Sequence, residues 1–430
     1  MNADGQLWTT FLHSFAPVFT AAAFPLFCSL SSAWILCTGR HTVTRIYRIA
    51  EPSFGRAHDG YHRFFRCAAW CFDALCPPLL QVLVAMFYPA GTIPLLLDDT
   101  AFHKTGRKIS GAGWWRDAVR STATKTVHCF GLNLIVLALK IDPPWVGEPL
   151  ALPVCVRLHA KGGATLLQVA AEMLRLLASW LPTRSFSLCA DGFYAPLAGE
   201  QLPRTTLISR IRQDAALYEV APRPKKHHRG RPRKKGTRLP TPAKLARTAR
   251  QWETVTVSVR GRAKKRLVHT RIVLWYHVNP TRPILLVICR DPAGKEKDDF
   301  FFATDLAMSG AQVVEHYASR WAIEDTFKNV KQSLGAEDPQ LRAQEGPFRA
   351  AAFSFWLYSA VWLWYLKRKP TARSWLHTPW YSKKTTPSFL DALASLRRVL
   401  WSRQIFLASE KPSLTVKNTK MLIEVLAYSA

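Results

Sequence analysis

Acidic residues are scarce in this chain. Only 29 Asp and Glu stand against 59 Lys and Arg in 430 residues, which gives a formal net charge of +30. An excess of this size is extreme for an enzyme of small molecules, and it indicates a polyanionic partner, above all nucleic acid. A hydrophobic content of 48% with 12% aromatics excludes a disordered chain. The length allows about two to four domains.

Signals for export and for disulfide bonding are also missing. No Lys or Arg precedes Arg40, so the N-terminus lacks the basic region of a secretory signal. The nine cysteines are an odd number without a disulfide-like frame, which favours a reducing cytoplasm. Cys67, Cys71 and Cys76 are spaced C-x3-C-x4-C, without the paired C-x2-C knuckles of a zinc site. We therefore expect a cytoplasmic protein.

Long apolar runs are rare. Residues 15–36 form the one segment that approaches the length of a membrane span, and Pro17 and Pro25 interrupt it. A buried pair of helices is the preferred prediction, with a membrane span as the alternative.

Residues 1–88 are predicted to form a helical domain. The pattern is a helix over 26–37, a turn at Gly39 and a second helix that Thr42 opens, which is consistent with a helix-turn-helix. Another helix is expected over 59–75. Arg45 and Arg48 lie three residues apart on one helical face and are candidate DNA contacts. An ordinary helical bundle with exposed arginines fits this pattern equally well.

From residue 89 the pattern becomes that of an α/β layer. The apolar run 93–97 predicts a buried strand that delivers Asp98, Asp99 and Thr100 at its end. Strands over 128–140 and 152–160, a helix over 164–181 and strands over 185–190 and 205–212 follow, and the fourth strand presents Asp191. Taken singly, each of these acids is more typical of a capped turn. The predicted catalytic core comprises 89–220 and 300–345.

A basic insertion is predicted over residues 221–299. Residues 223–271 hold 18 Lys and Arg against one acid, Glu253, and RGRPRKK resembles an AT-hook for the minor groove of DNA. Four alternating runs in this region predict strands, and Trp252 and Trp275 are expected in core packing rather than as platforms for a base. A solvated tail or a targeting signal is the alternative for the basic run. The candidate DNA contacts are Arg229, Arg231, Arg233, Lys234 and Lys235.

Residues 309–335 are predicted to form one long helix. Ser309 and Gln312 have the spacing of a capping box, and Gly335 offers a left-handed stop. At about 100° per residue, one narrow stripe carries Tyr317, Arg320, Glu324 and Lys331, whereas Asp325 points away from it. A solvated charged face is the default interpretation of such a stripe.

The acids predicted at the ends of two strands suggest a second interpretation of the polar stripe, in which Glu324 acts together with them. Asp98 (or Asp99), Asp191 and Glu324 form a three-carboxylate set, which suits two Mg²⁺ ions because hard cations prefer oxygen ligands. Paired ions of this kind activate the attacking oxygen and stabilise the leaving oxygen in phosphodiester chemistry.

The motifs resemble those of DDE transposases of bacterial insertion sequences, in the group with a Y-R-E-K signature. Tyr317, Arg320, Glu324 and Lys331 match Y-x2-R-x3-E-x6-K at every spacing. Asp98-Asp99-Thr100 matches the D-x-T of the first acid, which assigns Asp98 before Asp99, and Asp191-Gly192-Phe193-Tyr194 matches the second acid. The resemblance covers roughly residues 30–345, and residues 346–430 are expected to be helical without a matching motif.

This resemblance implies an RNase H-like core that binds two Mg²⁺, with Mn²⁺ as a substitute. The implied reaction is hydrolysis at the terminal inverted repeats followed by attack of the 3′-hydroxyls on target DNA, with a hairpin intermediate in related members. Tyr317, Arg320 and Lys331 would contact DNA phosphates, and a homodimer would synapse two ends. A catalytically inactive DNA-binding relic and another RNase H-like endonuclease are the alternatives. No membrane, small-molecule substrate or organic cofactor is expected.

Overall fold

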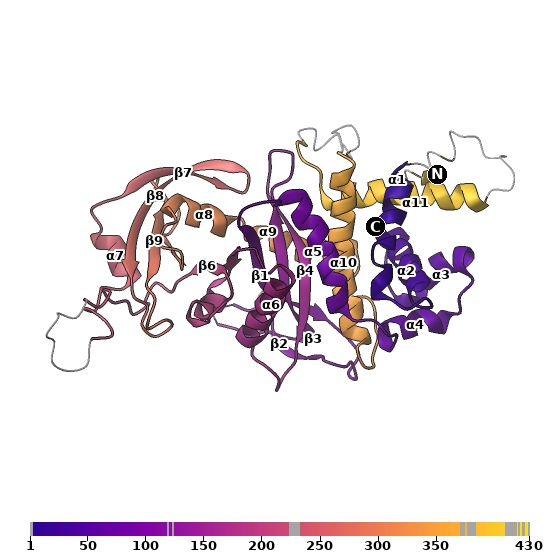
Figure 1. The fold of residues 1–430 in the computed structure, drawn as a ribbon, viewed down its shortest axis with the longest axis horizontal. Coiled ribbons are helices and arrows are strands. Elements are labelled where there is room, and N and C mark those ends of the chain that lie inside the picture. Colours follow the sequence, from indigo (N-terminus) through magenta and orange to yellow (C-terminus); the bar gives the residue numbers. More distant parts are fainter. Residues whose placement is uncertain are drawn as a thin grey trace.

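The computed structural model describes most of the chain. The described residues are 3–117, 120–122, 124–222, 233–369, 375, 384–408, 419, 422–423 and 426–428. Figure 1 shows an elongated molecule with a central α/β layer, the insertion strands at one end and the terminal helices at the other.

The apolar runs of the sequence build one mixed sheet of ten strands, in the order β2-β3-β1-β5-β6-β10-β9-β8-β7, and β4 pairs with β3. β1 runs antiparallel to β3 and parallel to β5, and β6 continues the parallel part beside β5. The mixed sheet with helical N- and C-terminal regions confirms the predicted RNase H-like α/β class. The strands of this central layer are β1 Ile93–His103, β2 Gly113–Arg116, β3 His128–Ile141, β4 Leu150–His159, β5 Phe186–Ala190 and β6 Thr205–Arg210.

All four strands predicted in the insertion are present, and they extend the central sheet. β10 pairs antiparallel with β6 on one side and with β9 on the other, so the sheet continues outward through β8 to β7. The second predicted run, over 266–278, continues to Val278, but β8 ends at Val273, because residues 275–279 fold into a turn in which Asn279 N donates to Trp275 O. These strands are β7 Glu253–Val259, β8 Arg262–Val273, β9 Ile284–Arg290 and β10 Asp299–Ala303.

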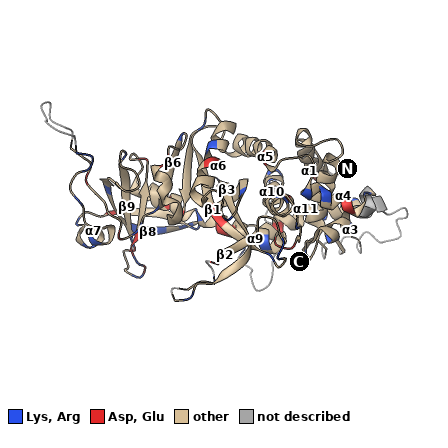
Figure 2. Cartoon of the chain, turned by 90° about the horizontal axis from the view of Figure 1, so that it is seen from below, with Lys and Arg blue, Asp and Glu red and all other residues tan. Residues whose placement is uncertain are grey.

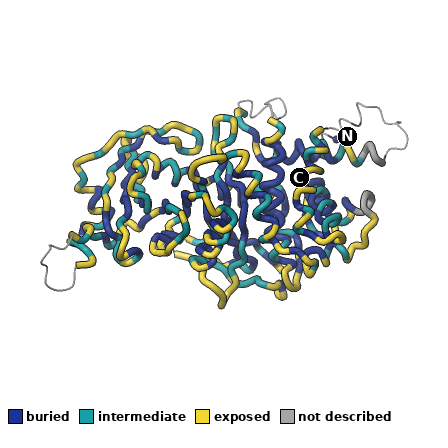
Figure 3. The backbone as a smooth tube through the Cα atoms, in the orientation of Figure 1, coloured by how far each residue is buried: buried dark blue, intermediate teal, exposed yellow. Residues whose placement is uncertain are grey.

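The terminal helices pack together, although they lie at opposite ends of the sequence. α10 is apolar on every side and is buried along nearly its whole length, as Figure 3 shows. It packs against β4 and against the N-terminal helices α4 and α5. No helix in the described part of the chain is long and apolar enough to cross a membrane. The terminal helices are α1 Ala3–His13, α2 Phe24–Leu36, α3 Val43–Phe54, α4 His58–Arg66, α5 Phe72–Phe87, α10 Gly346–Lys367 and α11 Phe389–Ala408.

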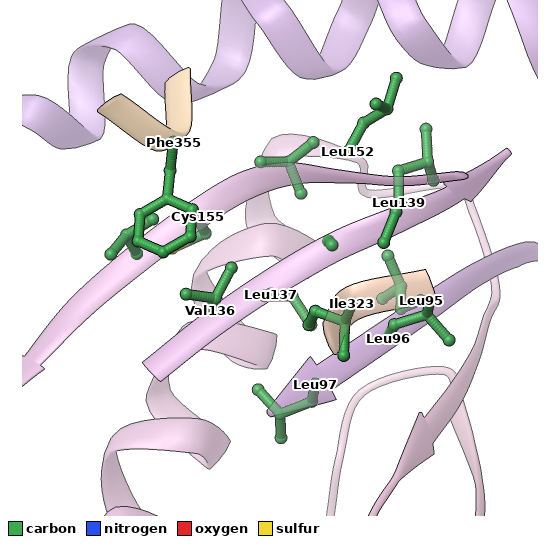
Figure 4. Close-up of a cluster of buried hydrophobic side chains, with 14 of the residues drawn as sticks. Leu95, Leu96, Leu97, Val136, Leu137, Leu139, Leu152, Cys155, Ile323 and Phe355 are labelled. Atoms are coloured by element: carbon green, nitrogen blue, oxygen red, sulfur yellow. The ribbon is translucent and has the colours of Figure 1, made fainter. Parts of the chain in front are cut away.

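The core sheet is covered by apolar side chains from helices that follow it in the sequence. Figure 4 shows Ile323 of α9 (Trp321–Ser333) and Phe355 of α10 among the aliphatic side chains of β1, β3 and β4. Both side chains are fully buried. Burying a side chain of this size contributes roughly 1.5–3 kcal/mol. This packing fixes α9 against the strand that carries Asp98. The remaining elements are α6 Leu166–Trp180, α7 Pro242–Thr248, α8 Gly310–Ala318 and the 3-10 helices η1 Ala16–Val18 and η2 Gly192–Gly199.

Two predicted helices are wrong in their continuity. The helix expected over 59–75 is divided into α4 and α5. In the segment between them, Trp70 Nε1 donates to Phe64 O and Arg349 Nη1 donates to Ala68 O, and these side-chain hydrogen bonds hold the backbone out of a continuous helix. The helix expected over 309–335 is divided into α8 and α9 at Ser319 and Arg320. At this junction Ala322 N bonds to Ser319 O, three residues back, which tightens the turn.

Candidate active site

The sheet register brings Asp98 and Asp191 together. The parallel pairing of β1 with β5 ends at Leu97 opposite Ala190, so the next residue on each strand is an aspartate. The prediction that Asp98 lies at the end of its strand is wrong, since β1 continues along β3 to His103. The two acids instead follow the last residue pair of the parallel ladder, at the carboxyl end of β5. Figure 2 shows an acidic segment of β1 near the middle of the molecule, close to α9.

Asp98 is held by contacts to both of its carboxylate oxygens. Oδ1 accepts a hydrogen bond from Asp99 N at 2.9 Å, and Oδ2 accepts one from Arg320 Nη1 at 2.6 Å. Burial raises the pKa of Asp98 to about 7, although Arg320 lowers it, and the charges of Asp191 and Asp99 raise it further. The effect of burial on this carboxyl therefore outweighs that of the guanidinium.

Glu324 reaches the same guanidinium from α9. Arg320 precedes Glu324 by four residues, one helical turn, and its Nη2 donates to Glu324 Oε1 at 2.7 Å. Burial alone would lower the pKa of Arg320, but Asp98, then Tyr317 and Glu324, raise it above its ordinary value. Asp325 is exposed, as its position on the helix predicts. One cation thus bridges a β1 carboxylate and an α9 carboxylate.

Asp99 has a different set of neighbours. Successive strand residues point to opposite faces of the sheet, and Asp99 Oδ1 accepts a hydrogen bond from Tyr194 of η2 at 2.9 Å. Burial raises the pKa of Asp99, while the hydrogen bond from Tyr194 lowers it. The arrangement favours Asp98 over Asp99 as the partner of Glu324.

Asp191 begins the 3-10 helix η2. Its Oδ1 accepts a hydrogen bond from Phe193 N at 2.8 Å, which caps the helix, and its backbone O accepts one from Ser209 Oγ at 2.7 Å. Asp191 therefore does cap a turn, which was the simpler interpretation of this acid in the sequence. The charge of Asp191 contributes to the raised pKa of both Asp98 and Asp99, so this carboxylate lies near both aspartates of β1.

Neither of the two other signature residues lies on a fully solvated stripe, since Tyr317 is buried and the side chain of Lys331 is 27% exposed. Tyr317 on α8 is buried, with its ring 4.6 Å from that of Phe301 and 5.5 Å from the guanidinium of Arg210. Lys331 on α9 donates from Nζ to Ala101 O at 2.7 Å, three residues beyond Asp98 on β1. Burial lowers the pKa of Lys331. Arg320 and Lys331 therefore bind β1 at Asp98 and Ala101, whereas Tyr317 packs against Phe301 of β10.

The described DNA contacts predicted on α3 and in the basic insertion lie on elements other than those that carry the three acids. Arg45 and Arg48 of α3 line a cavity of about 600 Å³ together with Trp401 of α11. Arg233 and Lys234 are exposed, and Lys235 Nζ lies 4.2 Å from the ring centroid of Tyr218. Arg229 and Arg231 lie outside the described residues. Trp252 and Trp275 are half-buried in packing, as expected.

Residues that the sequence did not single out also border the acids. Trp321, the first residue of α9, is 44% exposed, and Arg260 lies 4.3 Å from its ring centroid. Tyr194 stands in the D-G-F-Y motif without an assigned role, and its hydroxyl supports Asp99. Lys104 is buried and donates to the backbone oxygens of Glu337 and Pro339, a contact that no local sequence pattern indicates.

The comparison with protein families identifies the fold and its chemistry. A family model described as the DDE superfamily endonuclease matches residues 15–279, well over half of the chain. The matched segment contains Asp98 and Asp191 and ends before Glu324, so the place of Glu324 rests on the geometry above. No curated protein matches the chain. The chain belongs to the DDE superfamily of endonucleases, whose substrate is nucleic acid.

Proposed function

We propose that this protein is the DNA transposase of a bacterial insertion sequence. It would bind the terminal inverted repeats, cleave the DNA ends and join the freed 3′-hydroxyls to target DNA. One observation carries the proposal. Asp98 and Glu324, 226 positions apart in the sequence, bind the same guanidinium at 2.6 and 2.7 Å, next to Asp191. Two carboxylates, from β1 and α9, thus share one guanidinium in a DDE-family chain, and a third carboxylate follows β5 next to Asp98.

The donor set fits divalent metal ions. The converging groups of Asp98, Asp191 and Glu324 are all carboxylates, and Mg²⁺ prefers oxygen ligands and accepts substrate phosphates beside them. Two Mg²⁺, with Mn²⁺ as a substitute, would supply activation of the attacking oxygen and stabilisation of the leaving oxygen. Arg320 occupies Oδ2 of Asp98 and Oε1 of Glu324, so this side chain would have to withdraw before those oxygens could bind a metal.

The cations around the acids suit a phosphodiester substrate. When Arg320 leaves the carboxylates, its guanidinium is released beside the position of a phosphate, to which it can donate two parallel hydrogen bonds. Tyr317 lies between Arg320 and Arg210, with its ring centroid 5.8 and 5.5 Å from the two guanidinium groups. Lys331 adds an ammonium two turns beyond Glu324 on α9. Tyr317, Arg320 and Lys331 are therefore proposed to position the terminal phosphates.

Further contacts along the DNA would come from both ends of the molecule. The net charge of +30 supports binding to the phosphate backbone. Arg45 and Arg48 of α3 and the basic segment ending at Arg233, Lys234 and Lys235 are the proposed contacts. A homodimer would hold two transposon ends in one synaptic complex, in the cytoplasm beside the nucleoid.

The decisive experiment uses the DNA that flanks the gene. Inverted repeats bracketed by a short direct repeat would provide the substrate, and purified protein would be incubated with it and Mg²⁺. We expect strand cleavage at the repeat ends and joined products in target plasmid. Glu324→Gln should reduce cleavage by about a thousandfold or more with DNA binding retained, while Asp325→Asn, one exposed position further on the same helix, should cleave normally.

Other outcomes would identify the alternatives. Cleavage of branched or unrelated DNA without joined products would indicate another RNase H-like endonuclease. Tight binding without cleavage by the unaltered protein would indicate a DNA-binding relic. Full activity of Glu324→Gln would contradict the assignment of the third carboxylate.

A further inference from the structure

A second group of metal-binding side chains lies beyond Asp98 on the same strand. β1 ends at His103, and there the imidazole of His103, the carboxylate of Asp117 and the thiol of Cys129 offer ligand atoms that all lie within 4.8 Å of one another. His103 Nε2 and Asp117 Oδ2 are 3.7 Å apart. Asp117 and Cys129 are buried, while His103 is partly exposed to solvent. The group contains none of the three carboxylates assigned above.

The register of three strands explains why these side chains meet. His103 of β1 pairs with Gly131 of β3, and Cys129 comes two residues earlier on β3, on the same face of the sheet. A Cβ at position 131 would lie 1.9 Å from Phe102 O, so a glycine is required and no side chain separates His103 from Cys129. The ladder between β2 and β3 continues to Asp117, whose N donates to Val127 O at 2.8 Å. Asp117 therefore faces the same side as Cys129.

We propose that His103, Asp117 and Cys129 form a binding site for a thiophilic divalent cation of the Zn²⁺ class. An imidazole nitrogen, a carboxylate oxygen and a thiolate sulfur are a donor set that Zn²⁺ accepts and Mg²⁺ does not. Ligand atoms of a tetrahedral Zn²⁺ lie roughly 3.4–3.6 Å apart for the usual bond lengths. The 3.7 Å between His103 and Asp117 is close to this value. Small side-chain rotations bring the thiol within the same range, and a water molecule completes the fourth position.

The charges of the neighbourhood are compatible with this cation. On binding, the Cys129 thiol loses its proton to solvent, and the thiolate together with the Asp117 carboxylate balances the two positive charges. The occupied site is therefore neutral, one unit more positive than the empty site with its Asp117 carboxylate. Arg120 Nε lies 3.6 Å from Asp117 Oδ2, but its side chain is 66% exposed and turns into water at little cost.

Such a cation would connect the ends of three strands. His103 terminates β1, Asp117 follows β2, and Cys129 lies at the beginning of β3. A metal at this point would hold the far end of the strand that carries Asp98, five residues away. This role does not depend on the reaction proposed for the carboxylates, because it concerns the position of the strand and uses different side chains.

Cobalt titration of the full-length protein tests the site. Co²⁺ replaces Zn²⁺ in thiolate sites and gives a near-ultraviolet sulfur-to-cobalt charge-transfer band, which a carboxylate site does not give. We expect this band to saturate at about one Co²⁺ per chain, to vanish when Zn²⁺ is added and to persist in excess Mg²⁺. Cys129→Ser should abolish the band, and His103→Gln should weaken Co²⁺ binding at least tenfold.

Two control variants separate this site from its alternatives. Cys67 and Cys71 are exposed thiols, and the double variant C67S/C71S should keep the band in full. Asp191→Asn removes a proposed Mg²⁺ ligand and should leave the band unchanged, so the site can fail or succeed independently of the catalytic assignment. Circular dichroism of Cys129→Ser verifies its fold. Absence of the band from the unaltered protein, or its survival in correctly folded Cys129→Ser, would overturn the proposal.

Discussion

Arg320 donates one hydrogen bond to Asp98 of β1 and another to Glu324 of α9, at 2.6 and 2.7 Å. The two acceptors come from the first strand of the core and from a helix more than 220 positions later. Their carboxylates would repel each other if both were charged and unpaired. The guanidinium therefore holds the Glu324 carboxylate of α9 close to Asp98 of β1, where the two acids are proposed to bind metal.

Removing this guanidinium should strengthen metal binding. Arg320→Gln takes away a positive charge that competes for Asp98 and Glu324, and we expect Mg²⁺ affinity to rise by about tenfold. DNA cleavage should fall at the same time, because the proposed phosphate contact is lost. Isothermal titration of Mg²⁺ without DNA measures the first effect. Arg260→Gln, which removes the cation over Trp321, is the control, and weaker Mg²⁺ binding by Arg320→Gln would contradict the competition.

The two neighbouring aspartates of β1 should differ sharply in their effects. Asp98→Asn should abolish cleavage, since Asp98 faces Arg320 and Glu324. Asp99→Asn should retain most activity, because its carboxylate is bound by Tyr194 on the other face of the strand. Cleavage assays on matched DNA ends decide between them. Tyr194→Phe should resemble Asp99→Asn, and a dead Asp99→Asn beside an active Asp98→Asn would reverse the assignment.

The pKa of Asp98 predicts how stability changes with pH in the absence of metal. Burial raises this pKa from 3.8 to about 7, so the folded state retains a proton that the unfolded state releases. The contribution of Asp98 is therefore fully present below about pH 4 and is lost as the pH rises through about 7. Relative to Asp98→Asn, the unaltered protein should lose up to about 1.4 kcal/mol of unfolding free energy per pH unit in this window.

Denaturant unfolding in a chelating buffer at several pH values measures this difference. Asp142→Asn is the matched control, because the side chain of Asp142 is 70% exposed. Within the described residues, its carboxylate forms an ion pair with Lys140. The difference between the unaltered protein and Asp142→Asn should not follow the same window. An unaltered protein that gains stability relative to Asp98→Asn as the pH rises through this window would contradict the raised pKa.

The basic segment should contribute to DNA affinity without reading sequence. Arg233 and Lys234 are exposed, and changing both to Gln should reduce the slope of log affinity against log salt by about two. Arg175 and Arg212 already pair with Glu200 and Asp214, so the charge-matched double variant R175Q/R212Q should leave the slope unchanged. Fluorescence anisotropy over a series of salt concentrations provides both slopes, and equal slopes for all three proteins would exclude a phosphate contact by this segment.

The sequence was sufficient where the physics is local. Alternating and continuous apolar runs predicted the strands of the insertion and every core strand except the short β2, whose residues are not buried, because burial of one or both strand faces imposes those patterns. The capping box at Ser309 predicted the start of α8, and both of its hydrogen bonds are present. Helix continuity was less predictable. The break after Ala318 follows from tightened backbone bonds at Ser319 and Arg320, and no proline or glycine marks it in the sequence.

What the sequence determined by itself is the set of candidate groups: a strongly basic chain with acids after two apolar strand runs and a third acid on a polar helical stripe. Tertiary structure alone decided which oxygens meet. The β1–β5 register places Asp98 beside Asp191, and strand alternation directs Asp99 to Tyr194. The tertiary structure also places Arg320 between the carboxylates of Asp98 and Glu324 rather than on an exposed face. The physical reason is that spacing fixes directions only within one element, whereas distances between elements depend on how the whole core packs.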